Sequence, residues 1–137
     1  MVENDKFKVM LVGIIFDPAT KKILLAKRKK NPEHHCEYKW CFPGGKLFPG
    51  EEVNTEFKKI IKEKTGYKIK MLGPVFSGLH PIKKDYIAMY FLSEAYAGKQ
   101  KPGMDIIDLK WVKAKEVKKR IEEVYTKGVE EHIKYLR

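Results

Sequence analysis

Glutamates recur at helical spacing shortly after a glycine pair, and these residue types suit the binding of a metal ion and of phosphate. Glu56 and Glu63 are two helical turns apart, so one side of a helix carries both carboxylates. Mg²⁺ and Mn²⁺ prefer such hard carboxylate oxygens, with water completing the coordination shell. Gly44 and Gly45 precede this segment, where a tight loop lets the backbone approach a ligand and a helix N-terminus attracts phosphate. The pattern is therefore compatible with a site for a divalent cation and a phosphate group.

The elements that position these residues follow from the apolar pattern. Apolar runs over residues 7–16 and 23–26 flank turn residues and predict two strands, followed by a loop over residues 29–39. The glycines at 44–45 and the Pro-Gly pair at 49–50 are expected to interrupt regular structure. Helices are predicted over residues 53–66 and 115–126, the second capped at Gly128, and strands over 69–75, 85–96 and 106–112. We expect one α+β domain over residues 1–137, an α/β/α sandwich in which helices flank a mixed β-sheet.

The spacing of the glycines and glutamates resembles the Nudix box. That family's pattern is Gly, five residues, Glu, seven residues, Arg-Glu, an aliphatic residue, any residue, Glu-Glu, any residue, Gly and an aliphatic residue. Matching residues here are Gly45, Glu51, Ile61, Glu63 and Gly66. The strand pair ending in Lys27-Arg28, the strand at 86–91 and the Trp-containing segment at 105–112 also resemble the family, so nearly the whole chain is covered. The resemblance implies hydrolysis of the pyrophosphate bond in a nucleoside diphosphate linked to another moiety, with Mg²⁺ or Mn²⁺.

The charged positions of the family pattern are where the important departures occur. Lys59 and Ile60 stand where the family has Arg-Glu, and Lys64 replaces the last glutamate of the box, so Glu63 alone remains of three helix carboxylates. Lys59 keeps a positive charge and is expected to pair with Glu51, the role that the resemblance assigns. Ile60 removes a carboxylate, and the Lys64 ammonium raises the electrostatic cost of binding a cation. We therefore expect metal binding that differs from the usual form of the family, a change that can impair activity.

Glu56 offers a replacement carboxylate, because it lies one turn before Ile60 and shares a face with Glu63. The alternative interpretation is that Glu56, like Glu52, is an ordinary solvated residue. Further carboxylates outside the helix that could reach the ion are Asp85, Glu94, Asp105 and Asp108. Candidates for contacts to phosphate or base are Arg28, Gly44, Gly45, Lys46, Glu51 and His80. The catalytic set that we predict is Glu63, Glu56 and Lys59, with Glu63 and Glu56 as metal ligands.

A zinc site is the second metal hypothesis. His34, His35, Cys36 and Cys41 fall close together, and imidazole and thiolate groups are zinc ligands. Their spacing matches no standard zinc module, and adjacent histidines cannot easily turn toward one ion. We therefore favour the carboxylate site.

Composition limits the remaining classes of function. The net charge of +11 predicts attraction to polyanions, nucleotides and nucleic acids alike, although the basic residues are spread in the manner of a solvated surface. With two cysteines and no secretory leader, we expect a reducing compartment, the cytoplasm. The longest apolar run, residues 9–16, is too short to cross a bilayer. The edges of a mixed sheet permit a homodimer, but the sequence does not indicate one.

Three functions fit these observations. The first is a Nudix-type hydrolase acting on a nucleotide-type small molecule. The second is a catalytically silent Nudix domain that binds a nucleotide or an RNA end, and the third is a protein-interaction domain. Glu51, Glu63 and the intact glycine pair favour the first, and Ile60 and Lys64 favour the second. The sequence does not identify the substrate.

Overall fold

The computed structural model describes residues 7–29, 40–79 and 84–121, together with residues 129 and 133. Seven strands in this part of the chain form one sheet. They are β1 (Lys8–Phe16), β2 (Ile23–Arg28), β3 (Trp40–Cys41), β4 (Gly44–Leu47), β5 (Tyr67–Leu79), β6 (Tyr86–Gly98) and β7 (Ile106–Val112). The helices are α1 (Val53–Thr65), a 3₁₀ turn η2 (Ala114–Glu116) and α2 (Val117–Arg120).

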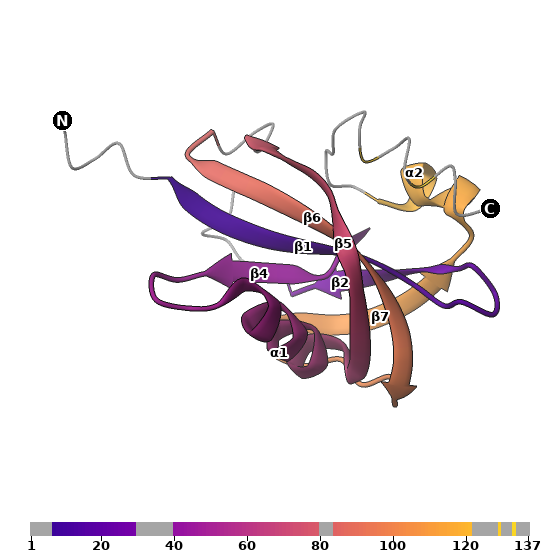
Figure 1. The fold of residues 1–137 in the computed structure, drawn as a ribbon. Coiled ribbons are helices and arrows are strands. Elements are labelled where there is room, and N and C mark those ends of the chain that lie inside the picture. Colours follow the sequence, from indigo (N-terminus) through magenta and orange to yellow (C-terminus); the bar gives the residue numbers. More distant parts are fainter. Residues whose placement is uncertain (1–6, 30–39, 80–83, 122–128, 130–132, 134–137) are drawn as a thin grey trace, which may run out of the picture.

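Strand β1 is the centre of the sheet (Figure 1). It runs parallel to β6 along its whole length and antiparallel to β4, which pairs with its first half. Strand β2 meets β1 at the turn after Phe16, and β3 and β7 pair with β2. Strand β5 completes the sheet on the outer side of β6. The sheet is therefore mixed, as the sequence predicts.

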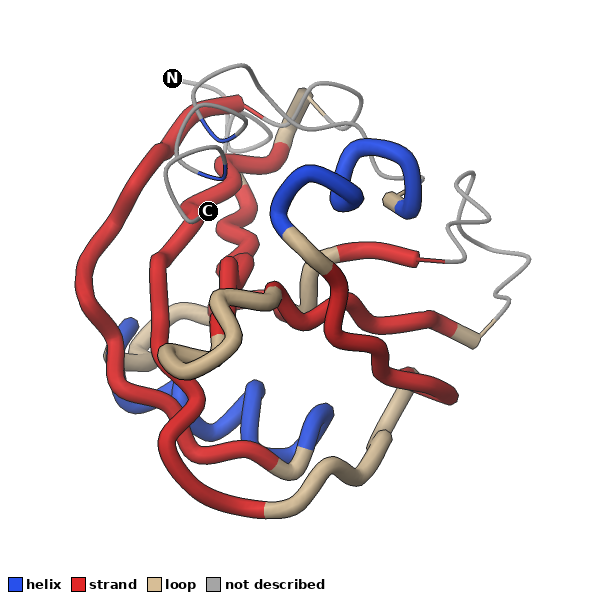
Figure 2. The backbone as a smooth tube through the Cα atoms, turned by 90° about the vertical axis from the view of Figure 1, so that its right-hand side faces the viewer, coloured by secondary structure: helices blue, strands red, loops and turns tan. Residues whose placement is uncertain are grey.

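Alternating side chains of β1 supply a core on each face of the sheet. Leu11 and Ile15 pack with Phe57 and Ile61 of α1 on one face. On the opposite face, β1 side chains pack with the C-terminal part of the chain, through Val117, Ile121, Val129 and Ile133. Figures 1 and 2 show α1 and α2 on opposite sides of the sheet. This arrangement confirms the expected α/β/α sandwich.

Two glycines let α1 and β4 approach β1 closely. A Cβ atom at Gly13 would lie 2.9 Å from Cζ of Phe57, so the aromatic ring of the helix rests directly on the strand. A Cβ atom at Gly44 would overlap the carbonyl oxygen of Leu11, so only glycine fits where β4 pairs with β1. These contacts fix the position of α1 and of the loop before it.

Two local predictions were wrong. The glycine pair was expected to interrupt regular structure, yet Gly44 and Gly45 begin strand β4 and pair with Val12 and Leu11. At Gly44 the backbone of Leu11 leaves no room for a side chain, so glycine is what allows the strand to form there. The helix expected over residues 115–126 is broken, since α2 ends at Arg120 and Ile121 is extended with φ −82° and ψ 132°. The rest of that prediction, from residue 122 to Gly128, lies outside the described residues.

The other predicted elements are confirmed, although β5 and β6 extend beyond the ranges 69–75 and 85–96. Most of the loop predicted at 29–39 lies outside the described residues. Among the residues that the structure describes, no helix has the length and apolar character needed to span a bilayer.

Candidate functional site

The loop between β4 and α1 is closed by Glu51. Its Oε1 accepts a hydrogen bond from the backbone N–H of Phe48 at 2.6 Å, and its own N–H donates to the Phe48 carbonyl at 3.2 Å. Gly50 takes a φ of 86° between them, a value that favours glycine. The expected ion pair between Glu51 and Lys59 is not formed in the described structure, since the ion pairs there involve other residues and Lys59 is exposed. Glu51 thus braces the loop through backbone bonds.

Helix α1 begins at a carboxylate cap. Glu52 accepts hydrogen bonds from the backbone N–H groups of Asn54 at 3.1 Å and Thr55 at 2.7 Å. Bonds from the Thr55 side chain and backbone, and then from the Asn54 backbone, lower the pKa of Glu52 below its ordinary value. Such a cap stabilises the first turn, which carries Glu56. Glu52 is therefore not merely a solvated residue.

A hollow of about 210 Å³ lies where β4, the loop before α1 and the exposed side of α1 meet. Six of the residues singled out in the sequence line it, namely Gly45, Lys46, Glu51, Glu56, Lys59 and Glu63. Phe48, Ile60, Lys64 and Met104 complete its lining. Helical spacing therefore predicted correctly that Glu56 and Glu63 lie on one side of the helix, and both border this hollow. Arg28 is half-buried at the end of β2 and is not part of this lining.

Ile60 occupies the middle of this helix face and contacts the glycine strand. A Cβ atom at Gly45 would be 3.2 Å from Cγ2 of Ile60, so the two residues are in close contact. Ile60 is only partly buried and forms an apolar part of the hollow. The isoleucine therefore has a packing role at a position where the family pattern places a carboxylate.

Lys64 is fixed between two other segments. Its Nζ donates to the Gly44 carbonyl at 2.6 Å and lies 3.1 Å from Oδ1 of Asp105. The lysine side chain is 11% exposed and that of Asp105 is 47% exposed. The Lys64 charge was expected to oppose cation binding, and the Asp105 carboxylate offsets part of that charge. Gly44 does not line the hollow, but its carbonyl oxygen holds Lys64, which does.

Of the four acids outside the helix, Asp105 alone is tied to a residue lining the hollow. Asp85 pairs with Lys8 at 3.8 Å, and Asp108 accepts a hydrogen bond from the backbone N–H of Leu109 at 2.8 Å. Glu94 lies within β6, opposite Phe16. None of these three lines the hollow. His80 lies outside the described residues.

Two exposed apolar residues border the hollow and were missed in the sequence. Phe48 is 60% exposed and Met104 is 62% exposed, although both are large and apolar. Met104 also has a φ of 54°, which is unfavourable for a bulky side chain. For Phe48 a signal existed, since it directly precedes the Pro49-Gly50 turn, where exposure is common. No sequence signal connects Met104 with α1.

The carboxylates that border the hollow are the candidate ligands of a metal ion. In the described part of the chain, no group of three or more His, Cys, Asp or Glu side chains is close enough to hold one. Mg²⁺, however, is commonly held by one or two carboxylates together with water and substrate phosphates. Glu56 and Glu63 border the same hollow and provide such oxygens, so the residues fit one divalent ion completed by water and substrate.

The zinc hypothesis receives no support from the described residues. Cys41 is buried, and its Sγ donates to the Ala26 carbonyl at 3.5 Å. This contact directs the thiol into the sheet and away from solvent. His34, His35 and Cys36 lie outside the described residues.

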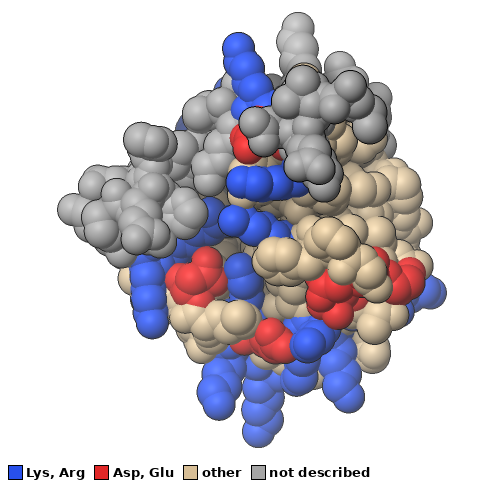
Figure 3. All heavy atoms as spheres, turned by 90° about the vertical axis from the view of Figure 1, so that its left-hand side faces the viewer, with Lys and Arg blue, Asp and Glu red and all other residues tan. Residues whose placement is uncertain are grey.

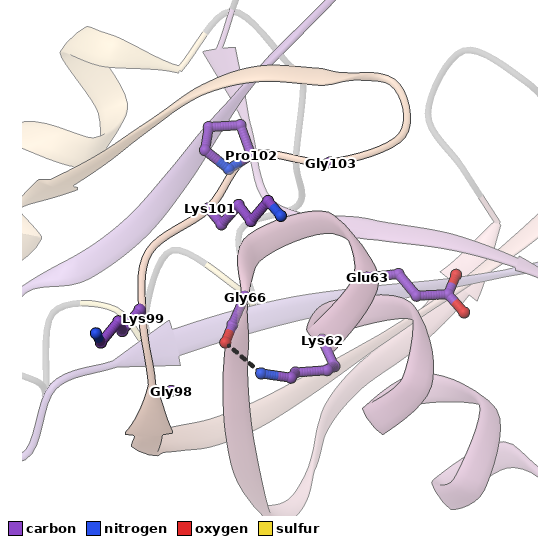
Figure 4. Close-up of a pocket in the computed structure, with 8 residues that line it drawn as sticks. All are labelled: Lys62, Glu63, Gly66, Gly98, Lys99, Lys101, Pro102 and Gly103. Carbon is purple, nitrogen blue, oxygen red and sulfur yellow. Dashed lines mark hydrogen bonds between the residues drawn. The ribbon is translucent and has the colours of Figure 1, made fainter.

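A larger hollow, of about 730 Å³, lies at the C-terminal end of α1 (Figure 4). Here the Lys62 ammonium donates to the Gly66 carbonyl at 2.9 Å, and the backbone N–H of Lys101 donates to the Thr65 carbonyl at 2.9 Å. Glu63 points away from these groups in Figure 4. Lysines are favoured at a helix C-terminus because of its partial negative charge. We interpret the groups around this hollow as structural, because they satisfy carbonyl groups at the end of the helix.

On the face drawn in Figure 3, charged side chains are distributed as the sequence predicts. Figure 3 shows one face of the molecule, over which basic side chains are widely spread and acidic ones form small groups between them. A distribution of this kind is typical of a solvated surface and gives a general attraction to anions.

Comparison with known proteins gives a consistent result. A family model described as NUDIX domain matches residues 7–132. An ADP-ribose pyrophosphatase of Methanocaldococcus jannaschii is 38% identical over 89 residues, which are 61% of this chain and 50% of that protein. A putative 8-oxo-dGTP diphosphatase of Bacillus subtilis is 30% identical over 93 residues, which are 68% of this chain and 58% of that protein. The chain thus spans about half the length of the curated relatives it matches.

Solved structures show the same fold. The MutT protein of Methanosarcina mazei Go1 has a TM-score of 0.70 and 15% identity, with 99% of this chain and 96% of that chain covered. At this identity the likeness establishes the fold and carries no information on the substrate.

Proposed function

The chain belongs to the Nudix family, and we propose that it is a divalent-metal-dependent hydrolase of the pyrophosphate bond in a nucleoside diphosphate linked to another moiety. The observation that carries the proposal is the position of Glu56 and Glu63, which border one hollow with Gly45, Lys46 and Lys59. This combination provides oxygens for a cation and positive charge for phosphates in one place. The relatives named as an ADP-ribose pyrophosphatase and a putative 8-oxo-dGTP diphosphatase support this class of substrate.

Most of the residues that line the hollow have a role in this proposal. Glu56 and Glu63 hold one Mg²⁺ or Mn²⁺, which when bound neutralises phosphate charge and activates water. Lys46 and Lys59 attract the diphosphate, and Gly45 leaves room for Ile60 to pack beside the β4 backbone. Glu51 positions the loop through its bonds with Phe48. Ile60 provides packing and no ligand, so fewer carboxylates act here than the family pattern contains.

The test is hydrolysis by the purified protein with Mg²⁺ or Mn²⁺, measured over nucleoside triphosphates, dinucleoside polyphosphates and nucleotide sugars, ADP-ribose included. Glu63→Gln is expected to abolish turnover, because it removes a ligand charge and leaves the side-chain size unchanged. Glu116→Gln is the matched control, since Glu116 lies in η2 and pairs with Arg120 at 3.8 Å. Turnover that survives Glu63→Gln unchanged would refute the assigned role.

A second function is favoured by Ile60 and Lys64, which replace carboxylates of the family pattern. In this alternative the chain binds a nucleotide or an RNA end without turnover. Thermal stabilisation by nucleotide with no hydrolysis would identify it. If only the double variant Ile60→Glu, Lys64→Glu is active, the natural domain is a binding module. A cytoplasmic location remains part of the proposal, as does the nucleotide-type small molecule as partner.

A further inference from the structure

Lys64 is a mostly buried cation at the edge of the proposed active site. Its side chain is 11% exposed, whereas Lys46 and Lys59, which line the same hollow, are exposed. A charge with little solvent around it is screened weakly and acts strongly on its neighbours. Solvent therefore screens the charge of Lys64 less than the charge of either exposed lysine.

The partners of Lys64 leave part of its ammonium available. An ammonium group has three N–H donors. One donates to the Gly44 carbonyl at 2.6 Å, and another faces Asp105 Oδ1 at 3.1 Å. The third has no acceptor among the residues that the structure describes, and Lys64 lines the hollow beside Glu63 and Ile60. A phosphate oxygen in the hollow would be a suitable acceptor for it.

The two partners also hold the ammonium in place. Gly44 belongs to β4, Lys64 to α1 and Asp105 to the segment before β7, so the contact joins three parts of the chain. The backbone N–H of Gly103 donates to the Lys64 carbonyl at 3.1 Å and ties the same segment to the helix. A long side chain normally loses conformational freedom when it binds an anion. For Lys64 most of that loss has already occurred on folding.

We propose that the Lys64 ammonium binds a phosphate oxygen of the substrate and acts as a resident cation where the family pattern has a metal-binding carboxylate. This inference rests on the proposed function, because it assumes that the diphosphate group enters this hollow. Its consequence is that the diphosphate binds measurably without any divalent ion. Asp105 holds the ammonium and competes with phosphate for its charge.

Calorimetry with inorganic pyrophosphate in the presence of EDTA tests the proposal. The natural protein is expected to bind, and Lys64→Met is expected to weaken binding about tenfold, as removal of a hydrogen bond to a charged group does. Asp105→Asn is expected to leave binding unchanged or to tighten it, because the carboxylate no longer competes. Lys62→Met is the matched control, since this lysine lies on the same helix but bonds to the Gly66 carbonyl.

A purely structural role of Lys64 gives a different pattern. If the contact only joined the three segments, Lys64→Met and Asp105→Asn would weaken pyrophosphate binding alike, and that result would overturn the inference. Absence of metal-free binding in the natural protein would overturn it as well. If Lys64→Met does not fold, pyrophosphate binding by Asp105→Asn and by Lys64→Arg, which keeps the charge, tests the inference instead. Weaker binding by Asp105→Asn, or loss of binding in a folded Lys64→Arg, contradicts it.

Failure of this inference is distinguishable from failure of the proposed function. Metal-dependent turnover that requires Glu63, without metal-free binding of pyrophosphate, leaves the hydrolase proposal standing and refutes the role of Lys64. Metal-free binding that depends on Lys64, without turnover of any substrate, supports the role of Lys64 and refutes hydrolysis.

Discussion

Replacing Ile60 with glutamate is expected to lower the stability of the metal-free protein. Ile60 is partly buried against Gly45, so it contributes part of the stabilisation of a fully buried isoleucine. Half of the stabilisation expected for a fully buried isoleucine is about 1 kcal/mol, and this is the expected loss in the free energy of unfolding. For a domain of this size, that loss lowers the melting temperature by about 4 °C. Thermal unfolding in EDTA, followed by circular dichroism, measures it.

The same substitution is expected to increase stabilisation by Mn²⁺. A glutamate at position 60 places a third carboxylate on the helix face that carries Glu56 and Glu63, which raises the affinity for a divalent cation. At a free concentration ten times the dissociation constant, one bound ion stabilises the folded state by about 1.4 kcal/mol. Mn²⁺ is therefore expected to offset the loss seen in EDTA.

Ile60→Gln is the control for this prediction. Glutamine has nearly the shape of glutamate and loses the same packing, but it adds no charge. The Mn²⁺-induced rise in melting temperature is expected to be larger for Ile60→Glu than for Ile60→Gln at each concentration. Equal rises in the two variants would refute the reasoning, because position 60 would then not face the site of the ion.

Two further predictions concern the loop before α1. The pKa of Glu52 is lowered by folding, so its contribution to stability is present above the unfolded value of about 4.5 and is lost as the pH falls through the lower folded value. In urea unfolding, the difference between the natural protein and Glu52→Gln should therefore shrink from pH 7 to pH 3; a constant difference would contradict the carboxylate cap. Phe48→Ala is expected to raise KM for a nucleotide about tenfold and to change kcat little, because an exposed aromatic ring beside the hollow suits stacking on a base. An unchanged KM in steady-state kinetics would exclude contact between Phe48 and the substrate.

The elements with strong patterns could be predicted from the sequence. The β-branched run of β1 and the periodic apolar residues of α1 gave the correct type and nearly the correct limits, and β7 was predicted over residues 106–112 as observed. Strand β4 could not be predicted, because it depends on a close approach of Gly44 to Leu11 that is a tertiary property. The break at Ile121 falls within a helical pattern and has no glycine or proline to mark it.

The part of the candidate site that a single helix supplies could be predicted from the sequence. Residue spacing alone places Glu56 and Glu63 on one face, and the structure has both beside the same hollow. The pairing of Lys59 with Glu51 was predicted wrongly, because Glu51 bonds to the backbone of its own loop. The contact of Lys64 with Asp105 joins distant parts of the chain, so spacing could not reveal it. Periodicity in the sequence thus identifies which residues share one side of a helix. Contacts between distant parts of the chain can be seen only in the structure.

Binding of Mn²⁺ measured by electron paramagnetic resonance tests the central claim most directly, namely that Glu56 and Glu63 jointly hold one divalent ion. The natural protein is expected to bind one ion per chain in this site in the presence of a nucleotide. Glu56→Gln and Glu63→Gln are each expected to weaken that binding, whereas Glu116→Gln is not. Unchanged Mn²⁺ affinity in both Glu56→Gln and Glu63→Gln would contradict the account and place the metal, or the function, elsewhere.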